Sequence, residues 1–465
     1  MNTKNLFLWA FLAVVLGLFA ACGDSAKPRL ITVSGKTLAD KLEWLDSNAA
    51  GNTGYLLKIK GAHEELAPYH LSCSSGDITV QLKGVGKERV VSFSGDGPLF
   101  TINSGVTLIL DNIALTGASG NNSALIQVNS GGGLQLNQGA KISGNAGGGV
   151  YNYGGTITMN GGEISGNTGG GARNDVIYTK IEEEYVTING TFTMNGGKIS
   201  GNTGGGVSNY GTFTLNGGEI SDNAGDGVHN NGGIFTMNGG KISGNTSSSF
   251  DGGGAHNGVI YTMIDGVYMA VNGTFTMNGG EISDNASSYG GGVSNHGIFT
   301  MNGGTISGNT AFFYGGGVDN HGAFTMNGGK ISGNASFFYG GGVSNRVTYT
   351  YTFEGYVSDV TFTMNDGEIS GNTASSYGGG VFVDNGVVLE KTGGTIAGYI
   401  ENDSGSNAVK DDSGAAQNDQ GHSVYVYHDN SDYIKLKDAA DGPGDVLLFY
   451  NGKLNPPTWS GKWDN

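Results

Sequence analysis

Six charged residues in the middle of the chain have the side chains needed to cleave a polysaccharide. Such cleavage needs two carboxylates that act as acid and base, or carboxylates that hold Ca²⁺ beside a Lys or Arg base. The candidates are Asp222, Asp226, Asp284, Asp319, Arg173 and Arg346. We expect the aspartates to lie on different sides of the fold, and each arginine stands where a loop begins. Their spacing therefore predicts no catalytic residue and no cofactor.

Three further motifs resemble chemical sites without completing one. Gly84-Val-Gly-Lys87 resembles a phosphate-binding loop, but Glu88 stands where that loop needs Ser or Thr. His296 and His321 occupy matching positions of a repeat, and we expect a stacked pair on the surface rather than a metal site. The acidic stretch 403–419 is interpreted as a solvated loop rather than a Ca²⁺ site. The sequence thus predicts no metal ligand.

A repeat organises the residues between these motifs. Its clearest copies are Phe192–Asn202 (Phe-Thr-Met-Asn-Gly-Gly-Lys-Ile-Ser-Gly-Asn) and Phe213–Asn223. Phe-Thr-Met and Lys/Glu-Ile-Ser alternate apolar and polar residues as strands with one buried face do, and Gly-Gly-Gly-Val-Ser-Asn supplies a third strand. A unit of about 22 residues is too short for a propeller blade and fits one coil of a three-sided solenoid.

In-register stacking of these coils explains the residues that recur at each position. Equivalent residues of stacked coils lie about 4.8 Å apart, so each column must tolerate contact with itself. Two Asn columns, one through Asn195 and Asn216 and one through Asn202 and Asn223, meet this condition. The residue before the Ile of each repeat is mostly Lys or Glu in alternation, so that no two like charges are adjacent in that column. These columns predict stacking and carry no sign of catalysis.

The fold expected is all-β: a right-handed parallel β-helix, that is, a three-sided solenoid of about 22 residues per coil. A helix opened by Thr37 and buried through Leu38, Leu42 and Leu45 would cap its start. The segments expected are a signal peptide (1–21), an anchor with the helical cap (22–54), irregular first coils (55–130), regular coils (131–400) and an acidic loop with a C-terminal β cap (401–465). Three β-hairpins would be inserted between coils.

The start of the chain resembles a bacterial lipoprotein signal. Lys4 precedes an apolar run from Leu6 to Phe19, and Phe19-Ala20-Ala21-Cys22 follows. The resemblance implies lipidation, palmitate included, of Cys22 and attachment to the outer membrane through that anchor. The alternative is an ordinary cleaved signal with an incidental cysteine. A net charge of −17 disfavours nucleic acid as a partner.

Insertions and aromatic residues mark the expected binding surface. The insertions 175–187, 259–270 and 347–357 all follow the third strand of a coil and alternate β-forming residues around a turn. Insertions at one corner of a repeat protein often mark its binding side. Their candidate residues are Tyr178, Tyr185, Tyr261, Tyr268, Tyr349, Tyr351, Phe353 and Tyr356.

A second set of aromatic residues lies in the turn before Gly-Gly-Gly-Val, which lengthens in later coils. Successive coils would align these rings into a stripe for a protein or a sugar. The alternative is that the rings only pack on one another and order the longer turns. The stripe comprises Phe250, Tyr289, Phe312, Phe313, Tyr314, Phe337, Phe338, Tyr339 and Tyr377, of which Phe312, Phe313, Phe337 and Phe338 are the binding candidates.

Two short motifs resemble those of polymorphic outer-membrane-protein repeats, known for GGAI and FxxN. Here they are Gly204-Gly-Gly-Val207 and Ile199-Ser-Gly-Asn202, with Val for Ile and Ile for Phe. The layout is also similar to β-helical, adhesin-like lipoproteins of host-associated bacteria such as oral spirochaetes. The resemblance implies cell-surface exposure and adhesion to a host protein or glycan.

The sequence is consistent with three functions. The first is an adhesin-like surface lipoprotein that binds through its hairpins and aromatic stripe. The second is a polysaccharide lyase or hydrolase of the pectin-lyase-like fold, which would need a carboxylate cluster in one cleft. The third is a passive surface antigen. The oligomeric state and a periplasm-facing orientation stay open.

Overall fold

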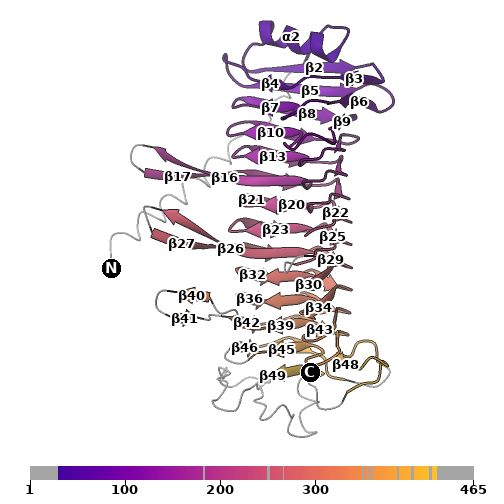
Figure 1. The fold of residues 1–465 in the computed structure, drawn as a ribbon, viewed down its shortest axis with the longest axis vertical. Helices are drawn as coiled ribbons and strands as arrows, with labels where there is room; N and C mark the ends of the chain where they lie inside the picture. Colours follow the sequence, from indigo (N-terminus) through magenta and orange to yellow (C-terminus); the bar gives the residue numbers. More distant parts are fainter. Residues whose placement is uncertain are drawn as a thin grey trace.

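The computed structural model describes residues 30–181, 184–248, 252–264, 267–347, 350–352, 355–357, 360–384, 387–399, 403–417 and 422–426. The expected signal peptide and Cys22 lie outside these residues, as does most of the expected C-terminal cap. Figure 1 shows a long stack of short strands with one helix at its start. The chain is thus a parallel β-solenoid of about 13 turns, as the 13 strands of one of its sheets show.

Three long parallel sheets run along the stack. Sheet A has 14 strands and contains the Phe-Thr-Met segment of each repeat. Its strands are β1 (Leu30–Thr32), β2 (Thr53–Ile59), β5 (Ile78–Gly84), β8 (Val106–Asp111), β11 (Gly133–Leu136), β14 (Thr156–Met159), β18 (Thr191–Met194), β21 (Thr212–Leu215), β24 (Ile234–Met237), β28 (Thr274–Met277), β32 (Ile298–Met301), β36 (Ala323–Met326), β42 (Thr361–Met364) and β46 (Val388–Lys391).

Sheet B has 13 strands and contains the Lys/Glu-Ile-Ser segment. Its strands are β3 (His63–Glu65), β6 (Arg89–Ser92), β9 (Ile113–Thr116), β12 (Lys141–Ser143), β15 (Glu163–Ser165), β19 (Lys198–Ser200), β22 (Glu219–Ser221), β25 (Lys241–Ser243), β29 (Glu281–Ser283), β33 (Thr305–Ser307), β37 (Lys330–Ser332), β43 (Glu368–Ser370) and β47 (Thr395–Ile396).

Sheet C contains the third strand of each coil, which in the regular repeats begins after the glycine-rich turn. Its parallel strands are β4 (Tyr69–Leu71), β7 (Phe100–Ile102), β10 (Ile126–Asn129), β13 (Val150–Tyr153), β16 (Ala172–Ile181), β20 (Val207–Asn209), β23 (Val228–Asn231), β26 (Ala255–Ile264), β31 (Val293–Asn295), β35 (Val318–Asn320), β39 (Val343–Asn345), β45 (Val381–Val383) and β49 (Val424–Val426).

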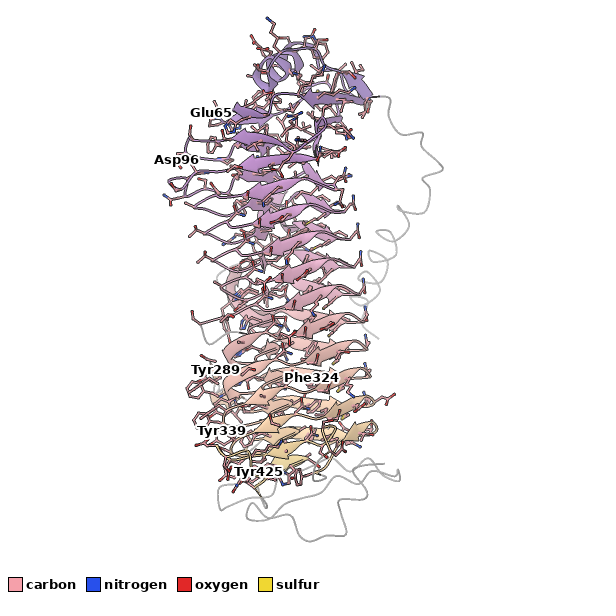
Figure 2. The ribbon with its side chains drawn as sticks, turned by 90° about the vertical axis from the view of Figure 1, so that its right-hand side faces the viewer. Glu65, Asp96, Tyr289, Phe324, Tyr339 and Tyr425 are labelled. Atoms are coloured by element: carbon pink, nitrogen blue, oxygen red, sulfur yellow. The ribbon has the colours of Figure 1, made fainter. Side chains whose placement is uncertain are left out.

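The repeat stacks in register, as its columns predicted. Phe192 pairs with Phe213 in sheet A, and Ile199 pairs with Ile220 in sheet B. The phenylalanine column is fully buried from Phe192 to Phe362, with neighbouring ring centroids 4.5 to 5.1 Å apart. Figure 2 labels one member, Phe324, within the stack. Each coil buries this column only by lying between its neighbours, which is why the fold needs many repeats.

Asparagine ladders hold neighbouring coils together at two of the turns. In the buried ladder, Asn202 Nδ2 donates to Asn223 Oδ1 at 3.0 Å, and Asn223 Nδ2 donates to Asn245 Oδ1 at 2.9 Å. In the exposed ladder, Asn216 Nδ2 donates to Asn195 Oδ1 at 2.9 Å. Both predicted Asn columns are therefore confirmed. A further buried ladder, which the sequence analysis did not predict, follows sheet C through Asn174, Asn209 and Asn230.

The one helix among the described residues, α2 (Leu38–Asn48), lies at the first coil. Thr37 accepts a hydrogen bond from the Asp40 amide at 3.1 Å, and Leu38, Leu42 and Leu45 are buried. The predicted helix, its capping residue and its buried face are thus confirmed. Strand β1 precedes the helix and already pairs with β2, so sheet A begins inside the segment expected to be only a cap. No helix of the described residues is long and apolar enough to span a bilayer.

The lengthened turns of the later coils form a fourth, lateral sheet that the sequence analysis did not predict. It arises because the extra residues of each turn pair with those of the next coil. Its strands are β30 (Ala286–Tyr289), β34 (Thr310–Tyr314), β38 (Ala335–Ser336), β44 (Thr373–Ala374) and β48 (Ala408–Val409). Tyr289, Phe312, Phe313 and Tyr314 lie within these strands, and Phe337 and Phe338 directly follow β38.

Three antiparallel strand pairs project from one side of the stack in Figure 1. Strand β16 pairs with β17 (Glu184–Asn189), and β26 pairs with β27 (Val267–Asn272). The third pair is β40 (Thr350–Thr352) with β41 (Gly355–Val357). The residues between the strands of each pair lie outside the described residues.

Candidate functional site

The first two projecting strand pairs extend directly from sheet C. The first three residues of β16 pair with β20 of the next coil, and its later residues pair with β17 instead. Strand β26 behaves in the same way towards β31 and β27. Tyr178 and Tyr261 lie on the extended parts and are 46% and 61% exposed. Both side chains are therefore accessible to a partner.

The remaining tyrosine candidates are placed by their backbone register alone. Tyr185 lies opposite Lys180 in the first pair, and Tyr268 lies opposite Met263 in the second. Tyr351 lies opposite Tyr356 in the third pair. Tyr349 and Phe353 lie outside the described residues, as does Phe250 of the expected stripe.

Four phenylalanines of the lateral turns form one cluster, here called the aromatic shelf (Phe312, Phe313, Phe337 and Phe338). The Phe312 and Phe337 rings are parallel, with centroids 5.5 Å apart and planes 2° apart. Phe313 meets Phe312 edge-on at 4.7 Å, and Phe338 meets Phe337 at 5.3 Å. Phe312 and Phe337 are 52% and 50% exposed, whereas Phe313 and Phe338 are half-buried. The inner pair thus orders the turns while the outer pair faces solvent.

A tyrosine ladder runs beside the shelf. Neighbouring ring centroids lie 4.3 to 5.7 Å apart along Tyr289, Tyr314, Tyr339, Tyr377 and Tyr425. Figure 2 labels three of these residues down one side of the solenoid. The expected stacking of aromatic residues from successive coils is confirmed for the described members of the stripe. Because each ring contacts the ring of the next coil, part of its surface is used to stabilise the turns.

An ion-pair cluster beneath the tyrosine ladder was not predicted. Arg346 lies over the Tyr314 ring, 3.7 Å from its centroid, and donates two hydrogen bonds to the buried Asp319. His321 Nε2 lies 3.1 Å from Asp319 Oδ2. Burial by itself would raise the pKa of Asp319, but the charges and hydrogen bonds of His321 and Arg346 hold that pKa well below its usual range. The cluster therefore anchors the ladder to sheet C.

Asp319, His321 and Arg346 each stand out in the sequence separately, and their positions in the repeat place Asp319 and Arg346 side by side. Asp319 lies second in the Val-x-Asn strand, and Arg346 follows the equivalent strand of the next coil. Ser344, which pairs with Asp319 in the register of sheet C, lies two residues before Arg346. The proximity of Asp319 to Arg346 is therefore visible in the sequence once equivalent positions of neighbouring coils are aligned.

A ladder of four histidines continues along the same corner. The rings of His229 and His256 are 4.7 Å apart, those of His256 and His296 are 5.5 Å apart, and those of His296 and His321 are 4.6 Å apart. The predicted stacking of His296 on His321 is therefore confirmed. Its expected surface position is wrong for His321, whose side chain is only 5% exposed and contacts Asp319 and the His296 ring.

The four aspartates considered for catalysis lie in two kinds of environment. Asp222 and Asp284 adopt left-handed backbone conformations, with φ of 57° and 58°, at equivalent turns after sheet B. Asp226 lies beside His229, and Asp319 is bound by Arg346. Among the residues that the structure describes, no three His, Cys, Asp or Glu side chains are grouped to hold a metal ion.

The comparisons with known proteins assign no function to this surface. No protein-family model matches the chain, and neither a curated protein nor a solved structure shows significant similarity to it.

Proposed function

We propose that the protein is a lipid-anchored rod on the outer surface of the bacterial outer membrane, where it binds host glycans or proteins. In this proposal the solenoid is right-handed and three-sided, with about 22 residues per coil. The projecting strand pairs are hairpins that display their tyrosines. Acylated Cys22 holds the rod at the membrane, and the signal-like order of Lys4, Leu6–Phe19 and Ala20-Ala21-Cys22 supports this anchor.

The aromatic shelf is the observation that carries the binding proposal. Phe312 and Phe337 are held parallel by Phe313 and Phe338, so their exposed positions are fixed before a ligand arrives. Fixed apolar rings lose little conformational entropy on binding and favour ligands with flat apolar faces, such as sugar rings. Large aromatic residues left exposed together are typical of interaction sites. A glycan is accordingly the preferred ligand class, with a host protein as the second.

The test is adhesion of the full-length lipoprotein, purified in detergent micelles, to a glycan array and to host cells. The Phe312→Ala/Phe337→Ala variant should lose at least about tenfold in affinity, because truncation of central aromatic residues typically costs at least this much. The matched control is Ile234→Ala/Ile298→Ala on sheet A, where the side chains are 48% and 42% exposed. Equal adhesion of the two variants would overturn the role of the shelf.

Three further experiments address the anchor and the projecting strand pairs. Cys22→Ser should abolish incorporation of labelled palmitate, and retained labelling would contradict the anchor. A protease tag placed at 259–270 should be cleaved on intact cells while a periplasmic control protein stays intact. Deletion of 175–187, 259–270 and 347–357 should weaken adhesion, and unchanged adhesion would show that these insertions are not part of the binding face.

A further inference from the structure

A cavity of about 310 Å³ opens at the corner between sheets B and C, several coils before the aromatic shelf. Its floor is the glycine-rich backbone of two successive short turns, 203–206 and 224–227. Ser247 and Ser248 of the next coil form one wall. In that coil, Thr246 forms an isolated bridge to Ala286, the first residue of the lateral sheet. The cavity thus lies where short turns give way to long ones.

Glycine at these turns keeps the cavity open. Gly205 has a φ of +98°, a backbone conformation that favours glycine, and a Cβ there would lie 2.9 Å from the carbonyl oxygen of Asp226. A side chain at this position would strain the turn and press on the backbone of the neighbouring turn that lines the cavity. The hollow is therefore built into the repeat at this point.

The cavity is lined mainly by polar groups with fixed positions. Asp226 is only 7% exposed, and its Oδ2 lies 2.8 Å from His229 Nδ1. The His229 ring is held in turn by stacking on His256 at 4.7 Å. Ser208 precedes His229 by one coil in the same outward column of sheet C. An aspartate, a histidine and three serines therefore line one small volume.

Tyr210 forms the aromatic side of the cavity. The guanidinium of Arg173 lies 4.8 Å from the Tyr210 ring centroid, and Asp175 holds that guanidinium at 3.0 Å. The tyrosine ring is thus positioned by an ion pair outside the cavity. Apart from glycine, only Val207 and Ala224 among the lining residues are apolar.

We propose that this cavity binds one neutral sugar ring, an inference that rests on the proposed glycan-binding function. A carboxylate oxygen accepts several hydrogen bonds and serves neighbouring hydroxyls well, while serine hydroxyls donate and accept. A purely apolar ligand finds few partners here, and Asp226 together with the net charge of −17 disfavours an anionic one. The volume is at the lower end for ligand sites, which matches a single ring.

The cavity and the shelf lie along one corner and suit one glycan. The Gly206 amide donates a hydrogen bond to the Asp226 carbonyl in the next coil. Two further coils separate the Asp226 turn from the Gly315–Gly317 turn beside the shelf. Three coil steps correspond to about 14 Å at 4.8 Å per strand. A glycan of a few rings therefore reaches from the cavity, which takes its end residue, to the phenylalanines.

The test uses free neutral monosaccharides with the full-length lipoprotein in detergent micelles and measures saturation transfer by NMR. Glucose, galactose, mannose, N-acetylglucosamine and N-acetylgalactosamine are the probes. The native protein should give saturation transfer with at least one of them. Ala224→Trp fills the cavity from an exposed position and should abolish the signal. Asp226→Asn keeps the side-chain size and should weaken binding at least about tenfold.

Thr168→Trp is the matched control, because Thr168 is exposed and its amide bonds Asn145 as that of Ala224 bonds Asn202. This variant should bind like the native protein. Circular dichroism establishes that each variant is folded, and Ala224→Trp keeps the test decisive should Asp226→Asn unfold. The inference would be overturned if the native protein transferred no saturation to any of the five sugars, or if Ala224→Trp transferred as much as the native protein.

The shelf variant separates this inference from the proposed function. Phe312→Ala/Phe337→Ala should lose adhesion and still bind the monosaccharide, because the cavity is intact. If the shelf variant lost adhesion while Ala224→Trp bound the monosaccharide normally, the cavity would be excluded as the sugar site and the proposed function would still be supported. Adhesion unaffected by the shelf variant would instead count against the proposed function.

Discussion

Arg346 donates hydrogen bonds of 3.0 and 2.8 Å from Nε and Nη2 to the two carboxylate oxygens of Asp319, one coil away. The same guanidinium lies over the Tyr314 ring. One arginine therefore joins sheet C to the tyrosine ladder across neighbouring coils. Because the Asp319 side chain is 1% exposed, the pair is screened little by water.

Breaking this pair should destabilise the solenoid strongly. Asp319→Asn removes one partner and leaves the Arg346 charge uncompensated in a nearly buried site, which typically costs about 3–5 kcal/mol. The measurement is the free energy of unfolding from urea titration. Lys83→Met, which removes the exposed partner of Asp111 at 2.7 Å, is the control and should cost at most about 1 kcal/mol. Similar losses for the two variants would contradict the role of burial.

The same pair predicts a loss of stability in acid. A carboxyl whose folded-state pKa is depressed stabilises the fold above its unfolded pKa of about 3.9, and this contribution disappears as the pH falls towards the folded value. The native protein should therefore lose more stability between about pH 5 and pH 3 than Asp319→Asn does. Urea midpoints across that range provide the measurement. Parallel curves for the two proteins would show that Asp319 does not carry the effect.

The regular coils were predictable because each core residue repeats its own environment. The Phe192 and Ile199 columns recur with similar spacing, so one copy reveals the packing of all. The lateral sheet was not predictable in the same way. Strands as short as Ala335–Ser336 contain no alternation to recognise, and their pairing depends on turn lengths that differ between coils.

The candidate site residues also differ in how far the repeat pattern predicts them. The exposure of Phe312 and Phe337 follows from their place in a lengthened turn of the repeat. The contact of Asp319 with Arg346 depends on residues that each occupy their repeat position in one coil only, whereas His229, the partner of Asp226, recurs as His256 in the next coil. A periodic pattern predicts the backbone register and gives no signal for such single substitutions. Aligning equivalent positions of neighbouring coils would have placed Asp319 beside Arg346, whereas Asp226 and His229 lie three residues apart within one coil.

The buried asparagine ladder should contribute more stability than the exposed one. Asn223 accepts two hydrogen bonds from Asn202 and donates to Ile199 and Asn245. Asn223→Ala leaves these buried groups without partners and should cost about 2–4 kcal/mol. In the exposed ladder, water replaces the lost partners of Asn216, so Asn216→Ala should cost less than about 1 kcal/mol. Urea titration of both variants tests the order, and equal costs would contradict it.

The alternating charges of sheet B should contribute a small, salt-dependent stabilisation. Glu219 lies between Lys198 and Lys241 in register, and Lys198 Nζ is 3.4 Å from Glu219 Oε1. Glu219→Lys places three lysines at neighbouring positions about 4.8 Å apart, which replaces attraction by repulsion on both sides. The expected loss is about 1–2 kcal/mol at low salt, and it should shrink towards 1 M salt, where the screening length is about 3 Å. Thermal unfolding at two salt concentrations measures it, with Glu219→Gln as the uncharged control. If Glu219→Lys and Glu219→Gln lost the same stability at low salt, charge alternation would not explain the column, and its residues would be retained for their fit to the strand alone.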